Sequence, residues 1–235
     1  MQRLEFSERE ATIHKAIVVS FDLGGFSAFC NHPEASIAAP RLVKWMFDLL
    51  NEHLGDQDTD VQVPKSVEEG KLPVPTFRKF SGDGALMLWA RPKGDDFPQS
   101  FCNLVVETMR RFQSEVERGL PACEKKWRVH NLPARARVGI TCGIVYALRP
   151  PHLLTSWTDP CDYVGYCINL AVRLQDHCPD LGFLVHGDLH PELPGMTRCS
   201  AVKIKGAQEE PVSMFSDDMA RVPKAEFDAK FRRDA

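Results

Sequence analysis

Two aspartates lie at the ends of apolar segments far apart in the chain, and their residue type suits metal chemistry. Asp22 follows the run AIVVSF and precedes two glycines, whereas Asp83 lies in KFSGDG, between two short apolar segments. The first pattern is typical of a buried strand that ends in a tight turn, and the second of a hairpin. Either aspartate could simply satisfy a turn. Together, at neighbouring strand ends, two carboxylates supply oxygen ligands for divalent cations, and a pair of such cations can promote displacement at phosphorus.

The segment after Asp22 suits phosphate binding. The sequence Gly24-Gly25-Phe26-Ser27 predicts a turn from strand to helix, in which glycines let backbone N–H groups approach a ligand closely. A helix that begins there points its positive end at an anion. An ordinary strand-to-helix turn explains the same residues equally well on local grounds.

An amide and a guanidinium are four residues apart in DYVGYCINLAVRL, the segment that begins at Asp162. This spacing places Asn169 and Arg173 on one face of a predicted helix. Arginine has the permanent charge and the fork geometry that stabilise a phosphoryl transition state. The alternative is a solvent-facing pair on a helix whose apolar side chains pack inward.

Composition limits the kind of protein. The chain has 235 residues, of which 43% are hydrophobic and 26% are charged, and this length predicts a single domain over residues 1–235. The formal net charge of −3 provides no general field that would attract nucleic acid or anionic lipid. Any anionic ligand must be held by local cations, which favours a small-molecule site and no nucleic-acid partner.

The sequence predicts a cytoplasmic protein without a membrane partner. The first residues, MQRLEFSERE, contain no apolar signal segment, and no window approaches about 18 uninterrupted apolar residues. The eight cysteines are scattered without a CxxC pair, and we expect them to be reduced residues of the core.

The order of apolar segments predicts an α+β fold. A polar insertion is expected over residues 55–75 and a charged tail, with a loose helix, over residues 217–235. Helices are expected over residues 41–54, 101–117 and 165–177. Strands are expected over residues 16–23, 76–81, 85–90, 137–141, 144–148, 182–186, 201–205 and 211–215, with 137–141 and 144–148 forming a pair around Cys142-Gly143.

Five motifs, in this order, resemble those of the class III nucleotidyl cyclase catalytic domain, the family of adenylyl and guanylyl cyclases. FDLGGFS is similar to the family's first metal-aspartate motif and KFSGDG to its second; RVGITCG resembles the strand that follows, DYVGYCINLAVRL the signature helix and VKIKG the closing strand. The resemblance covers about residues 12–216. It implies a ferredoxin-like βαββαβ-type core with a mixed, mainly antiparallel sheet and flanking helices. It also implies a head-to-tail homodimer that converts a nucleoside triphosphate to a 3′,5′-cyclic nucleotide and pyrophosphate at its interface.

The resemblance further implies roles for individual residues. Asp22 and Asp83, with the carbonyl of Leu23, would bind two divalent metal ions, Mn²⁺ or Mg²⁺, and the backbone at Gly25 and Phe26 would approach the triphosphate. Three groups would act from the partner subunit: Asn169 on the ribose, Arg173 at the α-phosphorus and Lys205 on the terminal phosphates. Lys79 and Asp162 stand where the family has its base-selecting pair. Since Ile144 stands where some relatives have a basic residue, Lys205 and the turn at residues 24–27 would take more of the triphosphate's charge.

Hydrogen bonding leaves the selected base open. A lysine donor and an aspartate acceptor suit adenine, but cytosine offers the same order of groups, and uracil also satisfies both. As a bare catalytic domain, the chain is similar to the stand-alone pyrimidine cyclases of bacterial Pycsar antiphage systems, whose product activates a downstream effector. This similarity implies UTP as substrate and cyclic UMP as product. ATP or CTP as substrate, and a non-catalytic cyclase-like binding module, are the alternatives.

Overall fold

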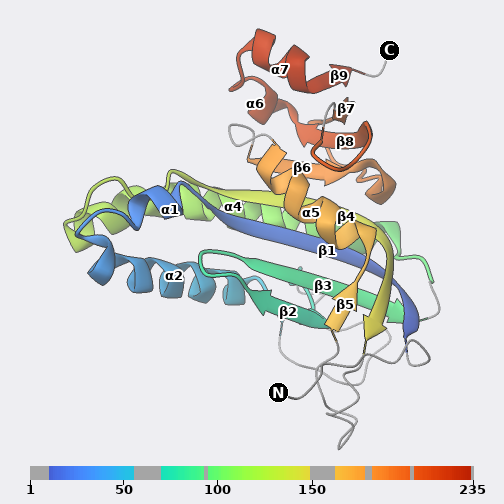
Figure 1. Ribbon diagram of the computed structural model, residues 1–235, viewed down its shortest axis with the longest axis horizontal. Helices are drawn as coiled ribbons and strands as arrows, with labels where there is room; N and C mark the ends of the chain where they lie inside the picture. Colours follow the sequence, from blue (N-terminus) through green and yellow to red (C-terminus); the bar gives the residue numbers. More distant parts are fainter. Residues whose placement is uncertain are drawn as a thin grey trace, which may run out of the picture.

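The computed structural model describes residues 11–55, 70–92, 95–148, 162–177, 182–201 and 204–233. Its strands form one mixed sheet in the order β2-β3-β1-β4-β6-β8-β7-β9, with β5 paired to β4 (Figure 1). The paired strands are antiparallel except for β4 and β6, which run parallel. The strands are β1 (Thr12–Gly24), β2 (Phe77–Phe80), β3 (Ala85–Pro92), β4 (Arg135–Leu148), β5 (Asp162–Val164), β6 (Phe183–His186), β7 (Met196–Ala201), β8 (Glu210–Phe215) and β9 (Phe231–Arg233).

The first half of the sheet confirms the predicted ferredoxin-like core. The chain runs β1, α2, β2, β3, α4, β4, and these four strands lie in the order β2-β3-β1-β4. This is a βαββαβ unit in which each helix connects two strands that are separated by a third. The helices are α1 (Phe26–Phe29), α2 (Ala35–Glu52), α4 (Gln99–Trp127), α5 (Tyr166–His177), α6 (Ser216–Met219) and α7 (Lys224–Lys230), with a short 3₁₀ turn, η3 (Gly187–Leu189).

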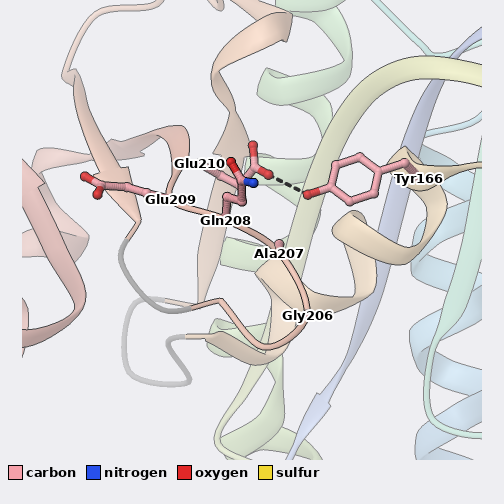
Figure 2. Close-up of a pocket in the computed structure, with 6 residues that line it drawn as sticks. All are labelled: Tyr166, Gly206, Ala207, Gln208, Glu209 and Glu210. Carbon is pink, nitrogen blue, oxygen red and sulfur yellow. Dashed lines mark hydrogen bonds between the residues drawn. The ribbon is translucent and has the colours of Figure 1, made fainter.

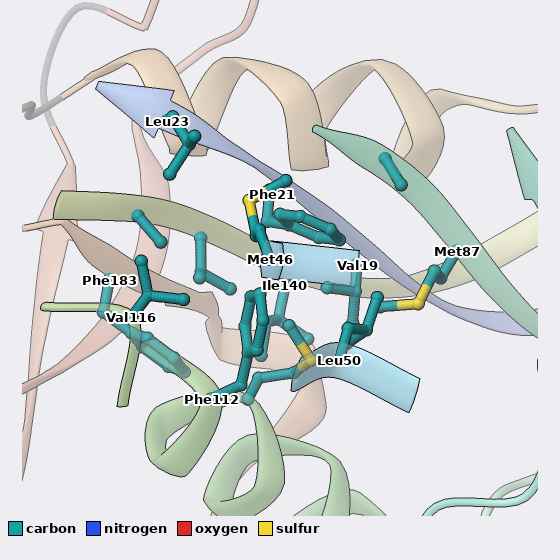
Figure 3. Packing of buried hydrophobic residues seen from close by; sticks show 14 of the residues in the cluster. Val19, Phe21, Leu23, Met46, Leu50, Met87, Phe112, Val116, Ile140 and Phe183 are labelled. Atoms are coloured by element: carbon teal, nitrogen blue, oxygen red, sulfur yellow. The ribbon is translucent and has the colours of Figure 1, made fainter. Parts of the chain in front are cut away.

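Strand β1 is buried on both faces, which explains its uninterrupted apolar run. Ala16 and Val18 pack with Cys167 and Ala171 of α5 on the other side of the sheet from α2 and α4. The alternate residues face the larger cluster, where Figure 3 shows them against Met46 and Leu50 of α2 and Phe112 and Val116 of α4. These alternate residues of β1 are Ile17, Val19, Phe21 and Leu23.

Strand β4 corrects the predicted strand pair around Cys142-Gly143. It is one continuous strand that pairs with β1 from Arg135 to Ala147. Gly143 makes no turn: a Cβ there would lie 3.0 Å from the Cβ of Cys167 in α5. Gly139, on the same face of the strand, would overlap the carbonyl of Ala171 if it had a side chain. Gly143 was expected to mark a turn, but both glycines allow α5 to lie directly on the strand.

Two other element boundaries differ from the sequence prediction. Helix α2 begins at Ala35 although Pro40 lies inside it, and α4 extends to Trp127 past Pro121. Both prolines are typical of helix ends, so the sequence pattern underestimated each helix.

The predicted strand over residues 201–205 does not extend to its predicted end: residues 202–203 lie outside the described residues, and Ile204 and Lys205 are not in a strand. Strand β7 covers Met196–Ala201. Lys205 lies in a turn in which the N–H of Ala207 donates to the carbonyl of Ile204 at 3.1 Å. Gly206 has a φ of +71° in this turn, a conformation that suits glycine. The described part of VKIKG, from Ile204 to Gly206, therefore belongs to a turn rather than to a strand.

Several sequence predictions concern the surroundings of the core. Cys102, Cys123, Cys142, Cys167 and Cys199 are free and buried, as expected, whereas Cys30 is exposed. Most of the predicted insertion at 55–75 lies outside the described residues. Within the described part of the chain, no helix has the length and apolarity needed to cross a membrane. The tail contains the expected helix, α7, and also strand β9, which pairs with β7.

An ion pair connects this tail to the long helix α4. Arg110 donates from Nη1 to Oδ2 of Asp218 at 2.8 Å and from Nη2 to Oδ1 at 3.1 Å. The side chain of Asp218 is 0% exposed. Burial raises the pKa of Asp218, and the charge of Arg110 opposes that rise. The buried carboxylate therefore depends on Arg110 for its charge.

We expect Arg110→Met to lower the free energy of unfolding by about 3 kcal/mol at neutral pH, because it leaves a buried carboxylate without its bidentate partner. Losing that partner raises the folded-state pKa of Asp218 further. As the pH falls, the buried carboxylate becomes protonated and neutral, so the variant loses less unfolding free energy than at neutral pH. Urea denaturation at pH 7 and pH 4.5 measures both effects. Arg118→Met, at an exposed position of the same helix, is the control and should change stability by less than about 0.5 kcal/mol. Equal losses for both variants would contradict this account.

Candidate functional site

The two predicted metal ligands meet where the end of β1 lies against the β2–β3 hairpin. Phe21 pairs with Ala85, so the hairpin turn at Gly82-Asp83-Gly84 lies directly beside Asp22. The N–H of Ser81 donates to the carbonyl of Gly84 at 3.0 Å, and Gly82 has a φ of +94°, as a tight hairpin requires. A Cβ at Gly84 would lie 2.7 Å from the Cα of Asp22 and would overlap the carbonyl of Phe21. The glycine therefore allows the approach that places the two aspartates together.

Arg137 of β4 holds the Asp22 carboxylate, a contact that sequence reasoning missed. Its Nε donates to Oδ1 at 2.9 Å and its Nη2 to Oδ2 at 2.5 Å, and both side chains are 19% exposed. Asp22 and Arg137 are direct partners in the β1–β4 register. The sequence shows these two opposite charges on two predicted strands. It does not give the strand register that places the two residues opposite each other.

The C-terminal end of α5 also reaches the Asp22 site. The Oγ of Ser20 donates to Oε1 of Gln175 at 2.5 Å, and Gln175 also hydrogen-bonds to the Asp22 side chain. Nη1 of Arg137 lies 3.4 Å from Oδ1 of Asp176. The orientation of Asp22 is thus set from two elements, β4 and α5.

The electrostatics of the two aspartates suit a cation. Burial raises the pKa of Asp22, and the hydrogen bond from Arg137 opposes that rise. Burial also raises the pKa of Asp83, and the negative charge of Asp22 raises it further. Backbone hydrogen bonding from Leu23 to Asp83 opposes this rise, so the carboxylate lies next to the backbone of the third expected ligand. Since each carboxylate oxygen can accept more than one contact, the Arg137 pair leaves acceptor capacity on Asp22.

The residues present therefore fit a divalent cation at this place: two adjacent carboxylates with unfavourable mutual charge, beside the backbone of Leu23. Among the described residues, no group of three or more histidine, cysteine, aspartate or glutamate side chains is placed to hold a metal ion. A cation here would depend on Asp22, Asp83 and oxygen atoms from the backbone, substrate or water.

The turn after Asp22 has the predicted form. Gly25 has a φ of +93° and is the N-cap of α1, a helix of four residues. The N–H of Phe29 donates to the carbonyl of Gly25 at 3.0 Å, and that of Cys30 to Phe26 at 2.8 Å. The backbone N–H groups of the first residues, Phe26 included, have no acceptor within the helix. Gly25 and Phe26 thus lie next to the aspartates, as expected.

Asn169 and Arg173 lie on α5, as predicted, and Arg173 packs against the turn that contains Lys205. Asn169 is exposed and Arg173 is half-buried. A Cβ at Gly206 would lie 3.0 Å from Cζ of Arg173 and closer still to Nη1. This Nη1 is buried and has no hydrogen-bond acceptor among the described residues. The guanidinium is thus held over Gly206 with one donor unused, next to the exposed Lys205.

The residues expected to select the base lie on two strands linked by aromatic rings. Lys79 of β2 and Asp162 of β5 are both exposed. Phe77 and Tyr163 make an edge-to-face contact with ring centroids 5.6 Å apart, which joins β2 to β5. Phe80, the other ring beside Lys79, points elsewhere and packs on Phe47 at 5.3 Å.

The structure thus arranges the predicted residues in two groups within one chain. Asp22, Asp83 and the turn at Gly25-Phe26 form an acidic group at the end of β1. Asn169, Arg173 and Lys205 form a basic and polar group on α5 and the turn before β8. Among the contacts between described residues, none joins a side chain of one group to a side chain of the other.

The fold is similar to solved structures of nucleotidyl cyclases. The adenylyl cyclase CyaB from P. aeruginosa has a TM-score of 0.58 at 15% identity, over 91% of this chain and 100% of that chain. The guanylyl cyclase Cya2 has a TM-score of 0.58 at 17% identity, over 87% and 92%. A bacterial light-regulated adenylyl cyclase has a TM-score of 0.62 at 15% identity, over 89% of this chain and 54% of that chain.

No model of a protein family matches the sequence, and no curated protein matches it. At such low identities, the structural likeness shows the fold. The chain therefore has the α+β fold of class III adenylyl and guanylyl cyclase domains.

Proposed function

We propose that the protein is a nucleotidyl cyclase that converts a nucleoside triphosphate to a 3′,5′-cyclic nucleotide and pyrophosphate at the interface of a homodimer. The observation that carries this proposal is the division of the site into an acidic group and a basic group that do not meet within one chain. Phosphoryl transfer needs both: carboxylates for metal ions and cations for the phosphates. A second copy, placed head to tail, brings the basic group of one subunit to the acidic group of the other.

In this proposal, Asp22 and Asp83 hold two divalent metal ions, Mg²⁺ or Mn²⁺, with the carbonyl of Leu23. Such ions, when bound, supply positive charge at the attacking and leaving oxygens of the displacement. Arg137 keeps Asp22 in a fixed orientation through its bidentate contact. The backbone at Gly25 and Phe26 approaches the triphosphate from the side of the acidic group.

The basic group acts on the substrate from the partner subunit. Asn169 orients the ribose, and Arg173 stabilises the negative charge that develops at the α-phosphorus while a bond from the 3′-oxygen forms and the bond to pyrophosphate breaks. The buried, unpaired Nη1 of Arg173 supports this role, because an unsatisfied guanidinium donor is a costly feature that an anionic acceptor relieves. Lys205 neutralises the terminal phosphates.

An exposed apolar row supports a second copy as the partner. Ile13 of β1 pairs with Tyr146 of β4, which pairs with Val164 of β5, and the three are 55%, 44% and 47% exposed. Neighbouring large apolar side chains on the outside of a sheet are typical of an interface. This row continues onto the strand of Asp162, so a subunit that covers it would also lie beside the proposed base site.

We propose that Lys79 and Asp162 read the base and that the base is a pyrimidine, with UTP preferred. The Phe77–Tyr163 contact joins the two strands that carry Lys79 and Asp162. The choice of a pyrimidine rests on the similarity to stand-alone pyrimidine cyclases. ATP is the competing candidate, because the order of donor and acceptor also suits adenine. CTP offers that same order with a single ring.

A cyclic pyrimidine nucleotide would act as a signal for a separate effector, in the manner of an antiphage defence system, and the protein would work in the cytoplasm. This extension rests on the similarity to stand-alone pyrimidine cyclases. It follows only if the product is cyclic UMP or cyclic CMP.

We expect the purified protein to form a cyclic nucleotide from at least one of ATP, GTP, CTP and UTP in the presence of Mn²⁺, and Asp22→Asn to reduce turnover at least about a hundredfold by removing a metal ligand. Chromatography of the products measures both. The matched control is Asp228→Asn on α7, an exposed carboxylate far along the chain, which should retain full turnover. Cyclic AMP as the main product would overturn the pyrimidine assignment. No product from any of the four nucleotides would contradict the cyclase proposal.

Metal binding can be tested without turnover. We expect Mn²⁺ to raise the thermal unfolding midpoint of the wild-type protein, because a ligand that binds only the folded state stabilises it. Asp83→Asn should abolish most of this shift, because it removes one of the two carboxylates, whereas Asp228→Asn should keep it. An equal shift in Asp83→Asn and in the wild type would show that the ion binds elsewhere.

A further inference from the structure

Tyr166, the first residue of α5, is bound to the start of strand β8. Its hydroxyl donates to Oε1 of Glu210 at 2.5 Å, the contact drawn in Figure 2. The two residues line an open pocket of about 610 Å³ whose other wall is the segment from Gly206 to Glu209. The hydrogen bond therefore attaches the segment before β8 to the first residue of α5.

Glu210 is itself fixed from behind. Its other oxygen, Oε2, lies 3.1 Å from Nε2 of His186, the last residue of β6. The side chains of Glu210 and His186 are 16% and 7% exposed, respectively. Because the carboxylate is held on both oxygens, it presents Oε1 to Tyr166 in one orientation. The hydrogen bond from Tyr166 raises the pKa of its own hydroxyl to about 12, so the hydroxyl stays a donor at neutral pH.

The other end of the same connection is held by Arg173. Ile204 is 3% exposed, and the Ile204–Ala207 hydrogen bond closes a turn with Lys205 and Gly206 at its tip. Arg173 packs over Gly206 so closely that a side chain there would overlap its guanidinium. The segment from Ile204 to Glu210 is thus attached to α5 at two places, one near each end.

These two attachments lie on the face of α5 that bears the proposed catalytic groups. Tyr166, Asn169 and Arg173 are at positions i, i+3 and i+7, which share one helix face. The attachments therefore flank Asn169 and set where Lys205 lies relative to both catalytic side chains. Tyr166 and Glu210 do not themselves occupy positions expected to contact the substrate.

We propose that Tyr166 and Glu210 are positioning residues that hold the Lys205 turn at the correct distance from Asn169 and Arg173. This inference rests on the proposed cyclase function and adds to it the pair that fixes the terminal-phosphate lysine. A lysine on an untethered turn would lose affinity for phosphates, because ordering its backbone would oppose binding. The tether removes that cost before the substrate arrives.

A double-mutant cycle with Lys205 tests this inference. Tyr166→Phe removes only the hydroxyl and keeps the ring, Lys205→Ala removes the charge, and the double variant combines them. The affinity for tripolyphosphate in the presence of Mg²⁺, measured by calorimetry, reports on phosphate binding without turnover. Thr197→Val, which removes a hydrogen-bonded hydroxyl from strand β7 outside both proposed groups, is the control.

We expect Tyr166→Phe to weaken tripolyphosphate binding about three- to tenfold, the range for the loss of one typical hydrogen bond. In the Lys205→Ala background the same change should have no further effect, because Tyr166 acts through Lys205. Glu210→Gln should weaken binding less than Tyr166→Phe, since an amide oxygen still accepts from the hydroxyl. Thr197→Val should bind tripolyphosphate as the wild type does.

Two outcomes would overturn the positioning role. One is an affinity for tripolyphosphate that Tyr166→Phe leaves unchanged. The other is a loss of affinity from Tyr166→Phe that is equally large in the wild-type and Lys205→Ala backgrounds. If the wild type makes a cyclic nucleotide while either outcome holds, the positioning role fails and the cyclase function stands. If the wild type makes no cyclic nucleotide, the cyclase function itself fails, and the positioning role falls with it.

Discussion

The close contact between α5 and strand β4 is the constraint on which the candidate site depends. At Gly139, a side chain would overlap the carbonyl of Ala171, and at Gly143 it would press on Cys167. Because the helix lies this near, its C-terminal end reaches Ser20 and Arg137, and through them Asp22. Its outer face holds Arg173 over Gly206 and Tyr166 on Glu210. One helix therefore connects the acidic group to the turn that bears Lys205.

The acidic group binds cations and the basic group binds anions, which is a physical reason for their separation within one chain. Asp22 and Asp83 raise the free energy of the folded chain by their burial and by the charge that Asp83 experiences from Asp22. Arg137 neutralises part of this charge, but Arg173 and Lys205 are directed elsewhere within the chain. A further cation paired with the aspartates in its own subunit would occupy the acceptor capacity that Arg137 leaves for metal ions. Keeping the cations apart until a substrate and a second copy are present avoids that competition.

Local patterns predicted the parts of the site that depend on short sequence segments. The hairpin at Gly82-Asp83-Gly84, the strand-to-helix turn at Gly24-Gly25 and the shared helix of Asn169 and Arg173 all follow from residue type and spacing. The family resemblance predicted the βαββαβ core, which the strand order β2-β3-β1-β4 confirms. The hairpin, the turn and the helix are each encoded within a short stretch of sequence, whereas the core was predicted from the order of the five motifs.

Features that depend on contact between distant segments were missed. Gly143 was interpreted as a turn because its sequence neighbours do not reveal that α5 crosses there. The pairing of Asp22 with Arg137 needs the register of two strands, and a shift of one residue would have separated them. The tie between Tyr166 and Glu210 joins residues 44 positions apart and involves a strand whose start was predicted one residue later. These are tertiary facts, and no local pattern specifies them.

The central claim is that one chain carries two half-sites that only a second copy completes, and subunit complementation tests it most directly. Asp22→Asn and Arg173→Ala impair opposite half-sites, so each variant alone should be inactive. Mixed and allowed to exchange subunits, they should form hybrid dimers in which one of the two sites has both halves intact. With random pairing, half of the dimers are hybrids, so the account predicts a recovery of about a quarter of the wild-type turnover. A mixture of well-folded, exchanging variants that stays inactive would contradict the account.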